Sequence, residues 1–147
     1  MITHIARFTF EDTIRWGIVK GDAVQLLADN YDTTEALLND RSNIEHQAKS
    51  NDGKYIMLDD VTLLSPITKP CRVICQGANY RQHMIESGMD PDAKAFNMFF
   101  NKSSASVCGS NDNVIKPAHV SLLDYEVELG LVMGKAITEN TKINQSN

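Results

Sequence analysis

The sequence lacks an apolar run long enough to span a bilayer, and its N-terminal stretch lacks the basic segment and apolar core of a signal peptide. Its three cysteines, Cys71, Cys75 and Cys108, are too few and odd in number for a disulfide framework. Basic residues are in the minority, 14 Lys and Arg against 19 Asp and Glu, which gives a net charge of −5. These absences predict a cytoplasmic protein with reduced cysteines, and they argue against nucleic acid or a membrane as its partner.

What is present is an ordinary globular composition, with 42% hydrophobic and 22% charged residues in 147 positions. Residues 5–27 predict a β-meander with a Lys-Gly-Asp turn between two apolar runs. Residues 32–40 predict a short helix with Asp32 or Thr33 as its N-cap. Residues 55–67 predict a return to strand, and the polar stretch before them predicts a loop or a frayed helix.

Two prolines within residues 65–70 mark the expected domain boundary. Beyond it, residues 71–80 predict a short strand, and residues 81–87 predict a short helix that a glycine stops. Residues 90–100 predict a turn that leads into a strand. Residues 124–133 predict the most hydrophobic strand of the chain.

That last strand has an unusual acidic pattern. Asp124, Glu126 and Glu128 alternate with apolar residues, so on an extended chain their carboxylates share one face. Neighbouring carboxylates about 7 Å apart repel each other by roughly 2 kcal/mol at an effective dielectric of about 20. One interpretation is a half-exposed strand with its acidic face in solvent. The other is a divalent cation held by two carboxylates, which removes the repulsion.

A second candidate site lies in the helix predicted for residues 81–87. His83 and Glu86 are three residues apart, so they share a helix face and can form a hydrogen bond. A carboxylate on one imidazole nitrogen raises the basicity of the other, which is a general-base dyad for activating water. The alternatives are an incidental surface charge pair and a metal site, although a single short helix argues against a bundle-type metal site.

Taken together, four segments resemble the fumarylacetoacetate hydrolase superfamily in order and spacing. Pro70–Glu86 is similar to the family's strand–loop–helix entry, and Phe99–Ser106 is similar to its Phe-x-Lys-Pro segment. Val114–Pro117 resembles the segment that precedes the family's acidic strand. Leu123–Lys135 resembles that strand itself, with Glu-x-Glu in place.

This resemblance implies a role for each matching residue. Glu126 and Glu128 match two glutamate ligands of a divalent cation, with Mg²⁺ as the first choice and Mn²⁺ or Ca²⁺ as alternatives. Asp124 is not a usual ligand and is expected to have a structural role. His83 and Glu86 match the family's water-activating dyad, which lies on a mobile lid helix. Tyr80 and Lys102 match two positions that line the pocket.

The sequence departs from the family's pattern at three points. Ala78 stands where small members often have a polar or charged residue, and Ser103 stands where a proline is usual. A third metal ligand, an aspartate about thirty residues beyond Glu-x-Glu, and a later active-site lysine would lie past Asn147. We therefore expect this chain to be a fragment of a longer domain or a truncated gene product.

The resulting expectation is a β-rich α+β chain. Residues 1–66 are expected to form a small N-terminal β domain. Residues 67–147 are expected to form the beginning of the family's mixed β-sandwich roll, incomplete at the C-terminus. By resemblance, the complete protein is expected to be a homodimer.

The resemblance implies metal-dependent hydrolysis of a C–C bond in a 2-oxo or 1,3-dicarbonyl acid similar to fumarylacetoacetate or an acylpyruvate. The same arrangement of a metal and an enolate serves other reactions, so an isomerase or decarboxylase of 2-oxo acids is the first alternative. A non-catalytic truncated chain or interaction module is the second. The isolated chain is expected to bind metal weakly and to show no turnover.

Overall fold

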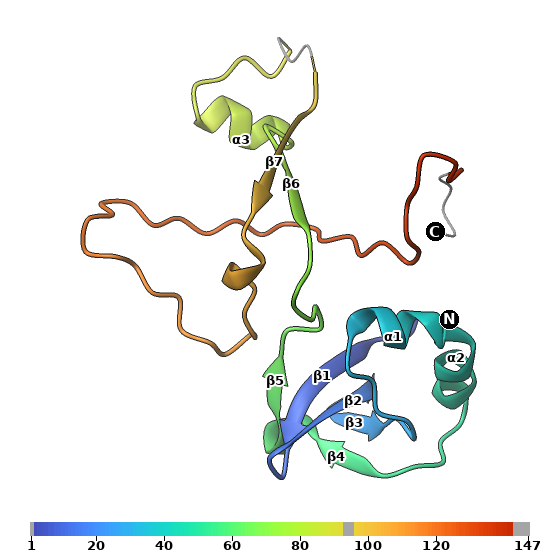
Figure 1. Cartoon of the computed structure of the whole chain (residues 1–147). Coiled ribbons are helices and arrows are strands. Elements are labelled where there is room, and N and C mark those ends of the chain that lie inside the picture. Colours follow the sequence, from blue (N-terminus) through green and yellow to red (C-terminus); the bar gives the residue numbers. More distant parts are fainter. Residues whose placement is uncertain (1, 93–95, 143–147) are drawn as a thin grey trace. The chain divides into compact units, whose positions relative to one another are not determined.

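The N-terminal part of the chain forms a five-stranded antiparallel sheet in the order β4-β3-β2-β1-β5 (Figure 1). The computed structural model describes residues 2–92 and 96–142. Consecutive strands β1, β2 and β3 are neighbours, which confirms the predicted β-meander. The strands are β1 (Ile5–Phe10), β2 (Thr13–Lys20), β3 (Ala23–Leu26), β4 (Tyr55–Met57) and β5 (Thr62–Leu64).

Two-residue loops join the first three strands. Glu11 and Asp12 have φ values of 48° and 57°, and this left-handed pair matches the twist of the flanking strands. In the second loop Gly21 has φ 60°, a conformation that glycine adopts without strain. The turn closes with Lys20 opposite Ala23, as the Lys-Gly-Asp pattern predicts.

Residues 55–67 form two short strands where the sequence predicts one. β4 pairs with β3 at one edge of the sheet, whereas β5 pairs with β1 at the opposite edge. The 3₁₀ helix η1 (Leu58–Asp60) connects them and contains two exposed aspartates. The division allows each short strand to hydrogen-bond to a different edge of the meander.

Two helices follow β3. In α1 (Thr34–Asn39) the backbone N–H of Ala36 donates to Thr33 Oγ1 at 3.0 Å. Of the two residues predicted as possible N-caps, Thr33 is therefore the one that caps the helix. The polar stretch 39–54, predicted as a loop or a frayed helix, instead contains the regular helix α2 (Arg41–Lys49). Helix α2 buries only Ile44 and Ala48, which are four residues apart on one face, and this narrow apolar stripe explains the error.

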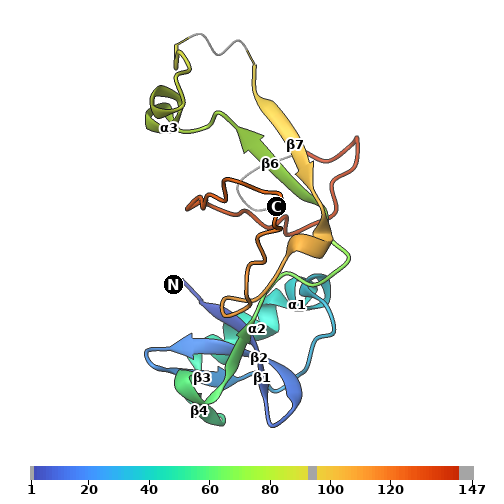
Figure 2. The ribbon, with the colours of Figure 1, turned by 90° about the vertical axis from the view of Figure 1, so that its left-hand side faces the viewer.

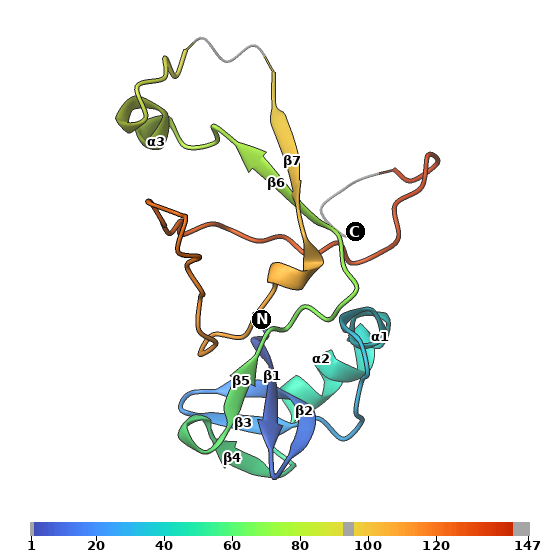
Figure 3. The ribbon, with the colours of Figure 1, turned by 60° about the vertical axis from the view of Figure 1, so that its left-hand side comes forward.

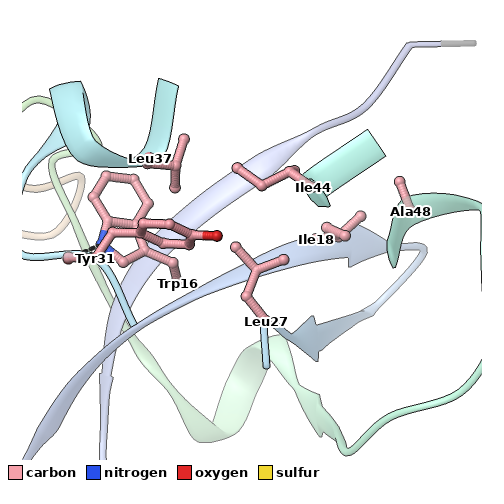
Figure 4. Close-up of a cluster of buried hydrophobic side chains, with 7 residues drawn as sticks. All are labelled: Trp16, Ile18, Leu27, Tyr31, Leu37, Ile44 and Ala48. Carbon is pink, nitrogen blue, oxygen red and sulfur yellow. Dashed lines mark hydrogen bonds between the residues drawn. The ribbon is translucent and has the colours of Figure 1, made fainter. Parts of the chain in front are cut away.

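Both helices pack on the same face of the sheet (Figures 2 and 3). The buried indole of Trp16, 2% exposed, lies at this interface, and its Nε1 donates a hydrogen bond to the backbone oxygen of Tyr31 at 2.7 Å. Burial of each large apolar side chain here stabilises the fold by roughly 1.5–3 kcal/mol. Figure 4 shows this cluster, which consists of Trp16, Ile18, Leu27, Tyr31, Leu37, Ile44 and Ala48.

The opposite face of the sheet has its own apolar cluster. Phe8 of β1 and Val24 of β3 are fully buried there, and partly buried side chains from η1 and β5 pack around them. Strand alternation explains the arrangement, since Trp16 and Ile18 face the helices while their neighbours in β2 face the second cluster. The sheet is therefore covered with apolar contacts on both faces.

A second, smaller sheet follows the proline-rich segment. Strands β6 (Val73–Gly77) and β7 (Met98–Lys102) form an antiparallel two-stranded ribbon (Figure 2). Helix α3 (Arg81–Glu86) lies in the connection between the two strands, and the 3₁₀ helix η2 (Ser104–Ser106) follows β7. Every residue of β7 is exposed.

Contacts divide the chain into two units, one of Met1–Pro66 with Gly109–Asn147 and the other of Ile67–Cys108. The domain division expected from the sequence, 1–66 and 67–147, stays a prediction. The described residues confirm a β-rich α+β chain with few helices, and none of their helices is long and apolar enough to cross a membrane.

Candidate functional site

Helix α3 positions two of the six candidate site residues, His83 and Glu86, and Tyr80 directly precedes it. Strand β6 ends at Gly77, and Ala78 turns the chain with φ 51° before α3 begins. The helix spans Arg81–Glu86, close to the predicted 81–87, and Gly88 follows with φ 72°. A left-handed glycine just beyond the last turn is a common helix stop, so the predicted termination is confirmed.

His83 and Glu86 both lie on α3 with exposed side chains, so the helix brings them to adjacent turns. The Glu86 carboxylate accepts its hydrogen bond from Gln82 Nε2 at 2.9 Å. Among the described residues, no hydrogen bond joins His83 to Glu86. The dyad contact is therefore not made in this structure, although the i, i+3 spacing keeps the imidazole within reach of the carboxylate by a rotamer change.

Tyr80 and Lys102 are the two expected pocket residues, and the structure places them differently. Tyr80 occupies the N-cap position of α3 and is 46% exposed. Lys102 pairs with Val73, at the end of the ribbon away from the Gly77–Met98 pair that precedes α3. Four residues of strand separate the two ends by about 13 Å. The ribbon therefore does not bring Lys102 beside the helix.

Ser103, which stands where the family pattern has a proline, follows Lys102 directly. Its backbone φ is −63°, which is the value that a proline ring imposes. Its hydroxyl accepts a hydrogen bond from Ala105 N at 3.2 Å and so caps η2. The serine keeps the backbone conformation of a proline at this position and adds a side-chain cap.

The acidic segment differs from its prediction. Residues 124–133 form no strand, and Tyr125, Val127 and Leu129, which alternate with the acidic residues, are 86%, 89% and 79% exposed. Alternation fixes only where side chains point, whereas a strand also needs a neighbour for its backbone hydrogen bonds. No described residue pairs with this segment, so the predicted strand is wrong for this structure.

Glu126 and Glu128 are exposed in that segment. Their carboxylate oxygens are hard donors, and this chemistry suits Mg²⁺, Mn²⁺ or Ca²⁺. In residues 2–92 and 96–142, no group of three His, Cys, Asp or Glu side chains is arranged to hold a metal ion. The two glutamates therefore fit a divalent cation by donor type, and their common orientation toward one ion stays a prediction.

An ion pair at α3 was not found from the sequence. Both terminal nitrogens of Arg81 contact Asp92, Nη1 to Oδ1 at 2.6 Å and Nη2 to Oδ2 at 3.0 Å. The hydrogen bonds from Arg81 lower the pKa of the Asp92 carboxyl. The two residues are separated by a glycine turn, and only the folded loop shows that they meet.

Comparison with known proteins identifies the family. Residues 72–146, just over half of the chain, match the family described as fumarylacetoacetate (FAA) hydrolase C-terminal. The chain belongs to the fumarylacetoacetate hydrolase family. Residues 3–66 match a second family, described as Rv2993c-like, N-terminal. All six candidate site residues lie within the segment that matches the fumarylacetoacetate hydrolase family.

Relatives in the fumarylacetoacetate hydrolase family come from bacteria and eukaryotes. The oxaloacetate tautomerase YisK of Bacillus subtilis is 42% identical over 107 residues, which cover 69% of this chain and 36% of that protein. The mitochondrial oxaloacetate tautomerase FAHD2A of Bos taurus is 37% identical over 76 residues, 52% of this chain and 24% of that protein. A fumarylacetoacetate hydrolase domain-containing protein 2 homolog of Dictyostelium discoideum is 37% identical over 82 residues, 56% of this chain and 26% of that protein.

These matches span about a third or less of each relative's length. The two relatives whose names state an activity are tautomerases, which are isomerases. Their names favour the isomerase alternative over C–C hydrolysis. Membership of the fumarylacetoacetate hydrolase family is thus compatible with more than one reaction.

Proposed function

We propose that the protein is an isomerase of 2-oxo acids that interconverts the enol and keto forms of oxaloacetate or a closely similar acid. The observation that supports this most is the similarity to oxaloacetate tautomerases, at 42% and 37% identity. The family match over residues 72–146 supports it further, since that segment contains every proposed site residue. Hydrolysis of a C–C bond in a 1,3-dicarbonyl acid is the competing reaction within the family.

The reaction needs proton transfer and charge stabilisation, and no bond to water forms. In the enol-to-keto direction, the enol oxygen loses a proton, and the carbon at the other end of the enol double bond gains one. The intermediate is an enolate whose negative charge lies near the acid's own carboxylates. A positioned acid–base side chain therefore accelerates the reaction, typically by 10²–10⁴-fold, and positive charge beside the enolate lowers the barrier further.

We assign the proton transfer to His83. An imidazole has one nitrogen that can accept a proton and another that can donate one, so a single histidine can take up and return the proton. The side chain is exposed on α3, and Glu86 is one turn away on the same short helix. Rotation of Glu86 away from Gln82 would let its carboxylate hold the imidazole in one tautomer.

We assign the binding of a divalent cation, Mg²⁺ by preference, to Glu126 and Glu128. A bound divalent cation would supply positive charge beside the oxygens of a 2-oxo acid. Tyr80 and Lys102 are proposed to contact the substrate, with the Lys102 ammonium suited to a carboxylate.

We further propose that residues 67–147 belong to a mixed β-sandwich roll. We also propose that the protein is a homodimer and that it acts on a small 2-oxo or 1,3-dicarbonyl acid.

The test is an assay of the enol-to-keto conversion of oxaloacetate in the presence of Mg²⁺. The reaction is monitored through the ultraviolet absorbance of the enol. In the complete protein, His83→Ala should lower kcat by roughly 10²–10⁴-fold, the usual effect of removing a positioned acid–base group. Glu86→Gln keeps the size of the side chain and removes the charge that orients His83, so it should lower kcat less than His83→Ala does.

The matched control is His46→Ala, because His46 is also an exposed histidine on a helix, but in α2. Its kcat should stay within about twofold of the unmodified protein, as expected for a surface substitution away from the site. Equal activity of the His83→Ala variant and the unmodified protein would exclude His83 from the proton transfer. Loss of activity in the His46→Ala variant would show that the assay reports general damage to the protein.

A further inference from the structure

Arg81 and Asp92 close the α3 connection on itself. Arg81 is the first residue of α3, and Asp92 lies beyond the glycine turn that ends the helix. Each of the two terminal guanidinium nitrogens donates a hydrogen bond to one carboxylate oxygen, Nη1 to Oδ1 at 2.6 Å and Nη2 to Oδ2 at 3.0 Å. Such two-point pairs are stronger and more specific in geometry than single contacts. The pair joins the start of the helix to the chain that leaves it.

The turn between the two partners is also hydrogen-bonded. The backbone N–H of Ser87 donates to the His83 oxygen at 3.0 Å, and the N–H of Met89 donates to the Met84 oxygen at 2.8 Å. Asp92 N–H donates to Asp90 Oδ1 at 2.9 Å, which turns the chain back toward the helix. The segment 81–92 is therefore a closed loop of backbone and side-chain contacts.

Helix α3 has little else to hold it. It has six residues, well below the length at which an isolated helix is stable in water. Met84 is its only buried side chain, and Tyr80 provides no side-chain cap. A cationic Arg81 in the first turn also opposes the helix dipole, and the Asp92 carboxylate offsets this charge. The ion pair thus acts where the helix is weakest.

From this geometry we propose that the Arg81–Asp92 ion pair holds α3 and thereby positions His83 for proton transfer, so that Arg81 and Asp92 are positioning residues. The second part of this proposal rests on the function proposed above. It explains why an exposed ion pair lies only two residues from the proposed acid–base group. It also gives a role to Arg81, whose side chain supports the helix through its two hydrogen bonds to Asp92.

The first experiment is hydrogen exchange of the backbone amides in residues 84–89, read by mass spectrometry. Asp92→Asn keeps the side-chain size and removes the charge, so exchange should become about two- to fivefold faster. Asp92→Glu keeps the carboxylate and should stay close to the unmodified protein. Glu45→Gln is the matched control, because it removes the exposed Arg41–Glu45 ion pair in α2 and should leave residues 84–89 unchanged.

The second experiment measures tautomerisation of oxaloacetate by the same variants. Asp92→Asn should lower kcat by about tenfold with KM within about twofold, because a misplaced His83 slows chemistry more than binding. Asp92→Glu should restore most of kcat. Faster exchange with an unchanged kcat would overturn the positioning role, and unchanged exchange would overturn the ion pair's support of α3. Absence of turnover in the unmodified complete protein would instead contradict the proposed function, while the exchange result still decides the helix support.

Discussion

Gly17 lies in the middle of β2, where the sheet leaves no room for a side chain. A Cβ at this position would approach the backbone oxygen of Gln25 at 2.6 Å and would collide with the Val24 side chain. Because a backbone oxygen in a paired strand cannot move without breaking the sheet, the clash cannot be relieved cheaply. This residue therefore fixes the close approach of β2 to β3.

We predict that Gly17→Ala lowers the free energy of unfolding by roughly 1–3 kcal/mol, the usual cost of overpacking. The measurement is urea unfolding followed by the fluorescence of Trp16, the one tryptophan of the chain, which is buried in the same sheet. Gly130→Ala is the control, since a Cβ at Gly130 has no atom within 4 Å. Equal midpoints for the two variants would contradict the packing described for β2.

Tyr31 gives the N-terminal sheet a pH dependence. The pKa of Tyr31 is raised to about 12, mainly by burial and also by the hydrogen bond and the charge of Asp40. The hydroxyl donates to Asp40 Oδ2 at 2.7 Å, so loss of its proton would leave two negative oxygens in contact. A raised pKa in the folded state means that the neutral tyrosine stabilises the fold.

The contribution of Tyr31 to stability is complete below its ordinary pKa of about 10 and is lost as the pH rises toward 12. We predict that the urea midpoint, read by Trp16 fluorescence, falls between pH 10 and 12. The Tyr31→Phe variant should be less stable at neutral pH and should show a smaller fall across that range. A fall of the same size in both proteins would assign the alkaline transition to other groups.

At the scale of elements, local patterns were sufficient wherever an element depends on its own residues. The Lys-Gly-Asp turn, the Thr33 cap of α1 and the glycine stop of α3 are short-range features, and all three were predicted correctly. The segment of α2 was predicted only as a loop or a frayed helix, because the stability of this helix comes from docking two apolar residues on the sheet. The Arg81–Asp92 pair was missed because its partners meet only through the folded turn.

The acidic segment 124–133 shows the limit of periodicity as evidence. Its alternation is that of a strand, yet the described residues offer it no pairing partner. Its proposed function as a source of metal ligands depends on Glu126 and Glu128, which the sequence identifies by spacing and family resemblance. The structure leaves both side chains exposed, so their role remains a prediction for experiment.

We predict that Mg²⁺ or Mn²⁺ binding to the protein, measured by calorimetric titration, weakens by at least about tenfold in the Glu126→Gln/Glu128→Gln variant, because neutral amides are poorer ligands for hard cations than carboxylates. Glu139→Gln is the control, since Glu139 is another exposed glutamate of the same C-terminal stretch. It should bind the ion as the unmodified protein does. Equal affinity in all three proteins would remove Glu126 and Glu128 from the metal site.

At the scale of the whole molecule, the proposed site residues are divided between two units. His83, Glu86, Tyr80 and Lys102 belong to the unit Ile67–Cys108, whereas Glu126 and Glu128 belong to the other. The family could be predicted from the sequence because its motifs depend on residue order alone. The reaction could not, because hydrolysis and tautomerisation both proceed through an enolate and use the same types of side chain.

The most direct test of the proposed isomerase activity is to give the complete protein the enol of oxaloacetate and, separately, an acylpyruvate, both with Mg²⁺. We predict that the enol decays faster than in buffer and that the His83→Ala variant loses most of this acceleration. We also predict that the acylpyruvate releases little pyruvate in the same time. Rapid pyruvate release without acceleration of enol decay would contradict the account and assign the protein to C–C hydrolysis.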